Sequence, residues 1–164
     1  GRRDEATSLT AGMRAEIAAL ERARERRQGD RPAPRVLLSI GHQAGSLANV
    51  TTVSDSTFLG EALRLAGGDN IFGDLTQRYP QISKESLIMR QPEIVLEVAP
   101  SYEPNPDPAH VAQLRADWEG LPSVPAVRRG RVHIMSEPYL LLPGPRLPQV
   151  VRRFFEALYP DEAP

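Results

Sequence analysis

Residues 69–97 constrain the fold of this chain more than any other part of its sequence. Ser83 is the best N-cap candidate there, because its hydroxyl can accept a hydrogen bond from a backbone N–H one turn later. Glu85 follows in the first helical turn, where the helix dipole favours negative charge. Pro92 ends this short helix, and residues 93–98 form a mainly apolar run of strand length. The stretch therefore predicts a loop, a capped helix and a buried strand, which together are one step of an α/β sheet.

The first thirty residues predict one long helix. Residues 7–28 contain no proline and are rich in Arg, Glu and Ala. Apolar residues recur along them at helical intervals and form one narrow stripe: Leu9, Met13, Ile17 and Leu20. Taken alone, the pattern is typical of a solvated surface helix with one packed side. Residues 29–34 contain Gly, Asp and two prolines, so we expect the helix to end there.

Strand-like and helical patterns alternate through the rest of the sequence. Strands are predicted at 35–40, 93–98 and 132–135, and helices besides the capped one at 56–66, 108–118 and 146–158. Such alternation predicts an α/β fold, a three-layer αβα lobe with a mainly parallel sheet, preceded by one long helix. The chain is thus expected to divide into a helix at 1–30 and a lobe at 31–164.

Loops at the carboxyl ends of the predicted strands are the places to look for a binding site, since ligands usually bind at that edge of an α/β sheet. Residues 41–55 and 99–107 are the two such loops. His42 and Gln43 come just after the first strand, and Tyr102 lies in the second loop. For each of these side chains, a polar residue in a solvated loop is the plain alternative.

Composition excludes several classes of site. A formal net charge of −1 argues against a general nucleic-acid surface, and the absence of cysteine excludes disulfides, thiolate metal sites and a cysteine nucleophile. No apolar run is long enough to span a bilayer, and residues 1–5 do not form a secretory signal. We therefore expect that any targeting segment was removed or never existed.

Catalytic and metal-binding motifs are missing from the sequence. It has no phosphate-binding loop ending in Lys-Ser or Lys-Thr, no His-Glu-x-x-His and no Gly-x-Ser-x-Gly. His42, His110 and His133 match no compact metal motif, so independent structural roles are favoured for them. The sequence predicts neither an enzyme nor an intrinsic cofactor.

Short motifs follow one another in a characteristic order from about residue 34 to residue 160. They are Gly67-Gly68-Asp69-Asn70, Tyr79-Pro80-Gln81-Ile82-Ser83-Lys84-Glu85, Gln91-Pro92-Glu93-Ile94-Val95-Leu96, Trp118, Leu121-Pro122-Ser123-Val124-Pro125-Ala126-Val127, Arg129-Gly130-Arg131-Val132 and Gly144-Pro145-Arg146. This ordered set resembles the C-terminal lobe of helical-backbone periplasmic binding proteins, which deliver cobalamin, ferric siderophores or haem to ABC importers. The resemblance implies that the long helix is the spine joining two lobes.

The same resemblance implies roles for individual residues. A bulky aromatic before Pro-Gln contacts the ligand in this family, which points to Tyr79. Apart from the resemblance, Tyr139 near the end of the chain is a further side chain that could face a cleft. A porphyrin ligand would take an axial bond from Tyr102 or His42. Glu85 matches the glutamate that pairs with arginines of the membrane permease; simple compensation of the helix dipole is its alternative role.

We expect from this resemblance the substrate-binding component of an ABC importer, located in the periplasm or otherwise outside the cytoplasm, with a lipid anchor on the precursor left open. Its partners would be the permease, a metal-chelate solute, and either a missing N-terminal lobe or a second copy of the chain. The alternative is a scaffolding module that keeps the lobe and has lost solute binding. Without a neighbouring lobe, some of the apolar stripe and of Phe154 and Phe155 should lie open.

Overall fold

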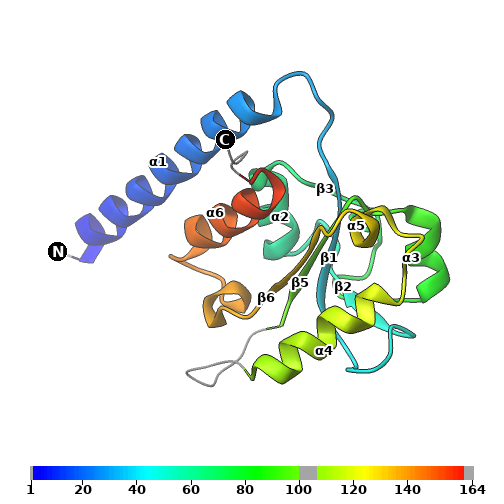
Figure 1. Cartoon of the computed structure of the whole chain (residues 1–164). Helices are drawn as coiled ribbons and strands as arrows, with labels where there is room; N and C mark the ends of the chain where they lie inside the picture. Colours follow the sequence, from blue (N-terminus) through cyan, green and yellow to red (C-terminus); the bar gives the residue numbers. More distant parts are fainter. Residues whose placement is uncertain (1, 100–106, 161–164) are drawn as a thin grey trace.

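The computed structural model describes residues 2–99 and 107–160 (Figure 1). Its elements, in chain order, are α1 (Arg2–Gln28), β1 (Arg35–His42), β2 (Val50–Thr52), α2 (Phe58–Ala66), β3 (Asp69–Asn70), β4 (Gln81–Ile82), α3 (Lys84–Arg90), β5 (Ile94–Val98), α4 (Pro108–Glu119), α5 (Pro125–Arg128), β6 (Val132–Met135), the 3₁₀ turn η1 (Pro138–Leu141) and α6 (Leu147–Leu158). Among these residues, no helix is both long enough and apolar enough to cross a membrane.

One sheet forms the middle layer of the lobe. The described residues give it six strands in the order β4-β2-β1-β5-β6, with β3 pairing β1 beside β2. Strands β3, β1, β5 and β6 pair in parallel, while β2 runs antiparallel to both β1 and β4. The predicted α/β class and the mainly parallel sheet are therefore confirmed.

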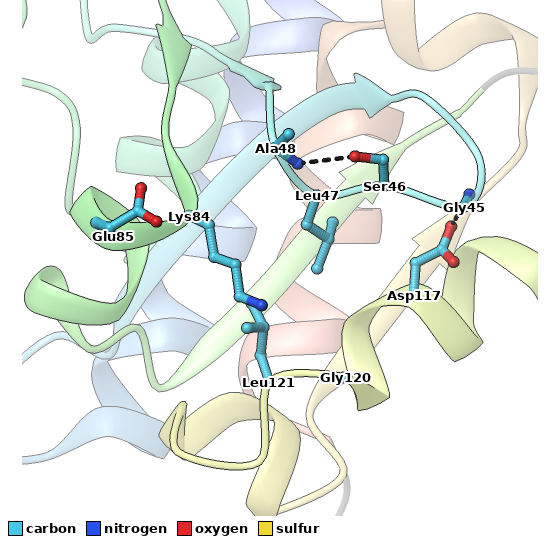
Figure 2. Close-up of a pocket in the computed structure, with 9 residues that line it drawn as sticks. All are labelled: Gly45, Ser46, Leu47, Ala48, Lys84, Glu85, Asp117, Gly120 and Leu121. Carbon is cyan, nitrogen blue, oxygen red and sulfur yellow. Dashed lines mark hydrogen bonds between the residues drawn. The ribbon is translucent and has the colours of Figure 1, made fainter.

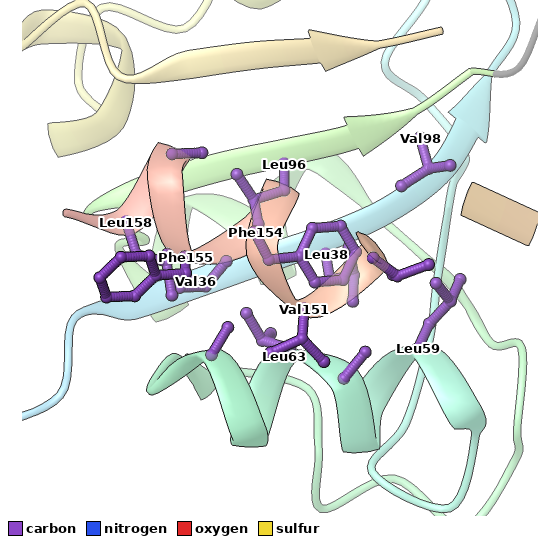
Figure 3. Packing of buried hydrophobic residues seen from close by; sticks show 14 of the residues in the cluster. Val36, Leu38, Leu59, Leu63, Leu96, Val98, Val151, Phe154, Phe155 and Leu158 are labelled. Atoms are coloured by element: carbon purple, nitrogen blue, oxygen red, sulfur yellow. The ribbon is translucent and has the colours of Figure 1, made fainter. Parts of the chain in front are cut away.

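Alternate residues of the central strands face two separate apolar layers. Val36 and Leu38 of β1 pack with α1, α2 and α6, whereas Leu37 between them packs with α3, α4 and α5. Figure 3 shows the first layer, in which Phe154 of α6 and Leu63 of α2 meet the strand residues. Because period-two side chains are apolar on both faces, the sheet is covered on both sides, which gives the three layers expected from the sequence.

The long helix α1 packs on the lobe only through its second half. Leu20 is 7% exposed, whereas Leu9 is 52% exposed on the half that extends past the lobe (Figure 1). The Tyr159 hydroxyl fastens the packed end, with Gln28 Oε1 at 3.2 Å and the Gly67 carbonyl oxygen at 3.0 Å. Leu9 thus confirms that part of the stripe lies open.

The two phenylalanines of α6 do not share the exposure of Leu9. Phe154 is fully buried and Phe155 is 6% exposed, because α6 packs against the sheet and α2 inside the first apolar layer. Neither phenylalanine therefore belongs to the open apolar surface that the sequence led us to expect.

Local signals placed most helix ends correctly. Ser83 caps α3 by accepting from the Ser86 N–H at 3.2 Å, and Gly67 ends α2 with a left-handed φ of 89°. The predicted loop at 41–55 is partly wrong, since β1 runs through His42 across a β-bulge and β2 lies within this range. A three-residue strand is too short to show an alternating pattern.

Candidate functional site

A pocket of about 450 Å³ lies where the loop after β1 meets the start of α3 and the end of α4 (Figure 2). Residues 45–48 of the loop form one wall, Lys84 and Glu85 of α3 a second, and Asp117, Gly120 and Leu121 the third. In Figure 2 the Lys84 side chain extends from α3 toward Leu121, and Asp117 lies beside Gly45. Charged side chains of both signs, Lys84 on one hand and Glu85 and Asp117 on the other, line this pocket.

Beneath the Asp117 side of this pocket lies a buried cluster of charged side chains. The His42 ring at the end of β1 has Glu97 Oε1 at 2.7 Å from Nδ1 and Asp117 Oδ2 at 3.2 Å from Nε2. The Trp118 indole N–H donates to the other oxygen of Glu97 at 2.5 Å, and its ring meets the imidazole edge-on, with centroids 5.6 Å apart. We call His42, Glu97, Asp117 and Trp118 the histidine cluster.

Charges in the histidine cluster are almost completely removed from water. The side chains of His42 and Glu97 have no exposed surface, and that of Asp117 is 8% exposed. Burial alone would lower the pKa of His42, but the hydrogen bonds and charges of Glu97 and then Asp117 outweigh it, so the pKa is raised above the usual 6.5. The contacts to two carboxylates and the raised pKa both favour a protonated ring.

Asp117 also connects the histidine cluster to the loop after β1. Its Oδ2 accepts from the Gly45 N–H at 2.7 Å, and its Oδ1 accepts from the Gln113 amide at 2.8 Å. Burial would raise the pKa of Asp117, but these bonds, together with His42, lower it. One carboxylate oxygen thus bridges the imidazole and the loop backbone.

The structure corrects the expected position of His42. The sequence placed it in the loop after the first strand, as a candidate ligand contact or axial ligand of a porphyrin. It is instead the last residue of β1, and both of its ring nitrogens meet buried partners from β5 and α4. Glu97, Asp117 and Trp118 were not predicted from the sequence as members of this cluster. Glu97 carried the one available signal, because a carboxylate between Leu96 and Val98 in a buried strand needs a partner.

The remaining predicted ligand contacts are spread over the lobe. Tyr79 precedes β4 and is 50% exposed, Gln43 is exposed just after β1, and Tyr139 lies half-buried in η1. Tyr79 comes just before the outer strand β4, and Tyr139 lies in the 3₁₀ turn that follows the outer strand β6. Tyr102 lies outside the described residues.

His110 and His133 do not join His42. His110 is exposed on α4 and His133 lies on β6, as predicted. Burial, and then the charges of Arg131, Arg153 and Arg115, lower the pKa of His133. Within 2–99 and 107–160, no group of three His, Cys, Asp or Glu side chains is arranged to hold a metal ion.

Known proteins resemble this chain over nearly its whole length. No family model matches the sequence. A vitamin B12-binding protein of Pectobacterium atrosepticum is 27% identical over 88% of this chain, and a cobalamin-binding protein of Halobacterium salinarum is 28% identical over 94%. The matched regions are 46% and 39% of those two proteins, so the chain spans less than half of either relative.

Solved structures give the same result for the fold. A periplasmic heme-binding protein from Pseudomonas aeruginosa superposes on 98% of this chain with a TM-score of 0.78 and 29% identity, and the match covers 55% of that structure. The lobe with its long helix therefore corresponds to about half of that structure. By sequence and by fold, the chain is similar to about half of periplasmic binding proteins that are named for vitamin B12, cobalamin or heme.

Proposed function

We propose that this lobe forms one wall of a cleft that binds a large metal chelate for delivery to an ABC importer. The observation that carries the proposal is the similarity to binding proteins for vitamin B12, cobalamin and heme over 88%, 94% and 98% of the chain. That similarity favours transport over the scaffolding alternative. These proteins are binding proteins by name, so the proposal includes no reaction.

The solute class follows from what those relatives have in common. Cobalamin and haem are both broad macrocycles that hold a metal, and a ferric siderophore is a chelate of comparable bulk. Tyr79, half exposed on the edge of the lobe, offers an aromatic face with a polar tip. Such a ring covers apolar macrocycle surface while its hydroxyl stays hydrated, so Tyr79 is the leading ligand contact, with Gln43, Tyr139 and Tyr102 as further contacts.

A second lobe would supply the opposite wall. The two curated relatives are more than twice as long as the part that matches this chain. In the proposal, α1 is the stiff connection between the lobes, and its open half around Leu9 packs on the other lobe. That lobe would come either from the same natural polypeptide or from a second copy. Periplasmic or other extracytoplasmic location is part of the same proposal.

Glu85 is proposed as the contact to the permease. It is exposed in the first turn of α3, and hydrogen bonds from its own backbone N–H and from Ser83 lower the pKa of its carboxyl group. The side chain therefore keeps its negative charge on the rim of the pocket, where a charge chiefly sets encounter and register with a partner.

Charge reversal tests this docking role. We expect Glu85→Lys, in the natural polypeptide, to reduce uptake by its importer by about tenfold or more, since rim charges across an interface that match in sign repel. Affinity for the solute should not change. Glu156→Lys, an exposed reversal on α6 across the sheet, is the matched control and should leave uptake intact. Normal uptake by Glu85→Lys, with solute binding preserved, would contradict the role.

Solute binding itself is tested by equilibrium titration of the natural polypeptide with cobalamin, haem and a ferric siderophore. The transport proposal requires tight binding of at least one of these chelates.

A further inference from the structure

In the histidine cluster one imidazole contacts two carboxylates, so both ring nitrogens need a proton if both contacts are to be hydrogen bonds. A protonated ring donates from both nitrogens, so it can satisfy Glu97 and Asp117 together. A neutral ring has one N–H, and the lone pair of its other nitrogen then points at a carboxylate oxygen. Loss of the proton therefore replaces one attractive contact with a repulsive one.

The contact to Asp117 is the one that should break. The Glu97 side chain on β5 is fully buried, and its contact to the ring is short at 2.7 Å. Its second oxygen accepts a hydrogen bond from Trp118. Asp117 stands at the pocket wall with 8% of its side chain exposed and a longer contact of 3.2 Å. Water can solvate the Asp117 carboxylate after a small rotation, whereas the buried Glu97 carboxylate cannot reach water in this way.

Loop residues 43–49, which we call the pocket loop, depend on the same carboxylate. Asp117 Oδ2 accepts from Gly45 N, and Gly45 has a left-handed φ of 87° that other residues rarely adopt. The neighbouring residues 45–48 line the pocket opposite Lys84 and Glu85. A rotation of Asp117 away from His42 would therefore also remove the acceptor of the Gly45 N–H.

We propose that His42 is a pH-sensitive positioning residue. As a cation it holds α4 and the pocket loop against the end of β1. Loss of its proton loosens the pocket loop, which lines the pocket opposite Glu85. The charged groups involved come from each packed element, Glu97 from β5, Asp117 from α4, and Lys84 and Glu85 from α3 across the pocket. Gln113 and the Gly45 N–H are the neutral partners of Asp117.

The direction of the pH dependence follows from the raised pKa of His42. The stabilising contacts of the protonated His42 ring are fully present below its unfolded pKa of 6.5. They are lost as the pH rises through its higher pKa in the folded state. His133 has the opposite sign, since its pKa is lowered by burial and by nearby arginines. The two rings can therefore be told apart by the side of 6.5 on which each titrates.

NMR titration of the full chain between about pH 5 and pH 9 tests the proposal. We expect the His42 ring and the Gly45 amide to change with one common midpoint above 6.5. Protection of the Gly45 amide from hydrogen exchange, corrected for the intrinsic pH effect, should fall about tenfold through that midpoint. The exposed ring of His110 on the same helix is the internal reference for changes outside the cluster.

The variant Asp117→Asn shows whether the charge of Asp117, and not only its packing, makes the position of the pocket loop depend on pH. The amide keeps an oxygen that can accept from Gly45 N but removes the charge, so the Gly45 amide should lose its pH response while the pocket loop stays in place. In the unmodified chain, either a Gly45 amide that ignores the titration of His42 or a His42 midpoint below 6.5 overturns the proposal. A Gly45 response that persists unchanged in Asp117→Asn also overturns it.

Discussion

Replacing Glu97 with alanine should destabilise the lobe by about 3–5 kcal/mol, because it leaves a buried cation without its main partner. Glu97 is fully buried, and both of its oxygens accept hydrogen bonds, one from His42 and one from Trp118. The variant removes both acceptors and opens a cavity beside Leu96. The measurement is the free energy of unfolding in urea at about pH 6, below the unfolded pKa of the histidine ring.

Glu97→Gln is the matched control for that loss. Glutamine keeps the volume, its oxygen can accept from Trp118, and its amide N–H can donate to a neutral His42 ring. Its cost should therefore be smaller than that of alanine and should grow as the pH falls and a proton is forced onto the ring. Equal losses for the two variants, or a loss below about 1 kcal/mol for Glu97→Ala, would contradict this account of the cluster.

Trp118→Ala should cost about 3–5 kcal/mol of folding free energy, which is typical for removal of a buried aromatic ring. Trp118 has no exposed surface and packs in the second apolar layer with Leu37 and Val95. The substitution removes that packing and also the N–H that holds Glu97. Chemical denaturation of the two proteins side by side gives the difference.

Trp118→Phe divides the two contributions. Phenylalanine fills most of the space but has no donor, so its cost should fall to about 1–3 kcal/mol, the penalty of one buried oxygen left unpaired. A Trp118→Ala protein as stable as the unmodified chain would show that α4 does not hold the sheet face as described. A Trp118→Phe protein as unstable as Trp118→Ala would point to the hydrogen bond rather than to packing.

Local chemistry made much of this fold predictable. Ser83 and Gly67 mark helix ends because a hydroxyl acceptor and a residue without Cβ satisfy terminal backbone groups wherever they occur. Strand β6 was predicted at its observed bounds, and β5 within one residue, because both are apolar runs of strand length. The short strands β2, β3 and β4 carry no such pattern and form only because β1 and its neighbours offer them open edges.

The histidine cluster depends on contacts that no local pattern encodes. His42 is 55 residues from Glu97 and 75 residues from Asp117 along the chain. The end of β1, β5 and α4 have to be assembled before the three side chains meet. Sequence reasoning could have marked Glu97 as a buried carboxylate in need of a partner, but not which residue would pair with it. The solute contacts at Tyr79, Gln43, Tyr139 and Tyr102 stay predictions.

Equilibrium titration of the natural polypeptide decides whether this lobe helps to bind a large metal chelate. We expect at least one of cobalamin, haem and a ferric siderophore to bind with a dissociation constant of about 1 μM or lower, and Tyr79→Ala to weaken that binding by about tenfold. Absence of binding to all three chelates by a folded, correctly assembled protein would rule out this chelate-binding role.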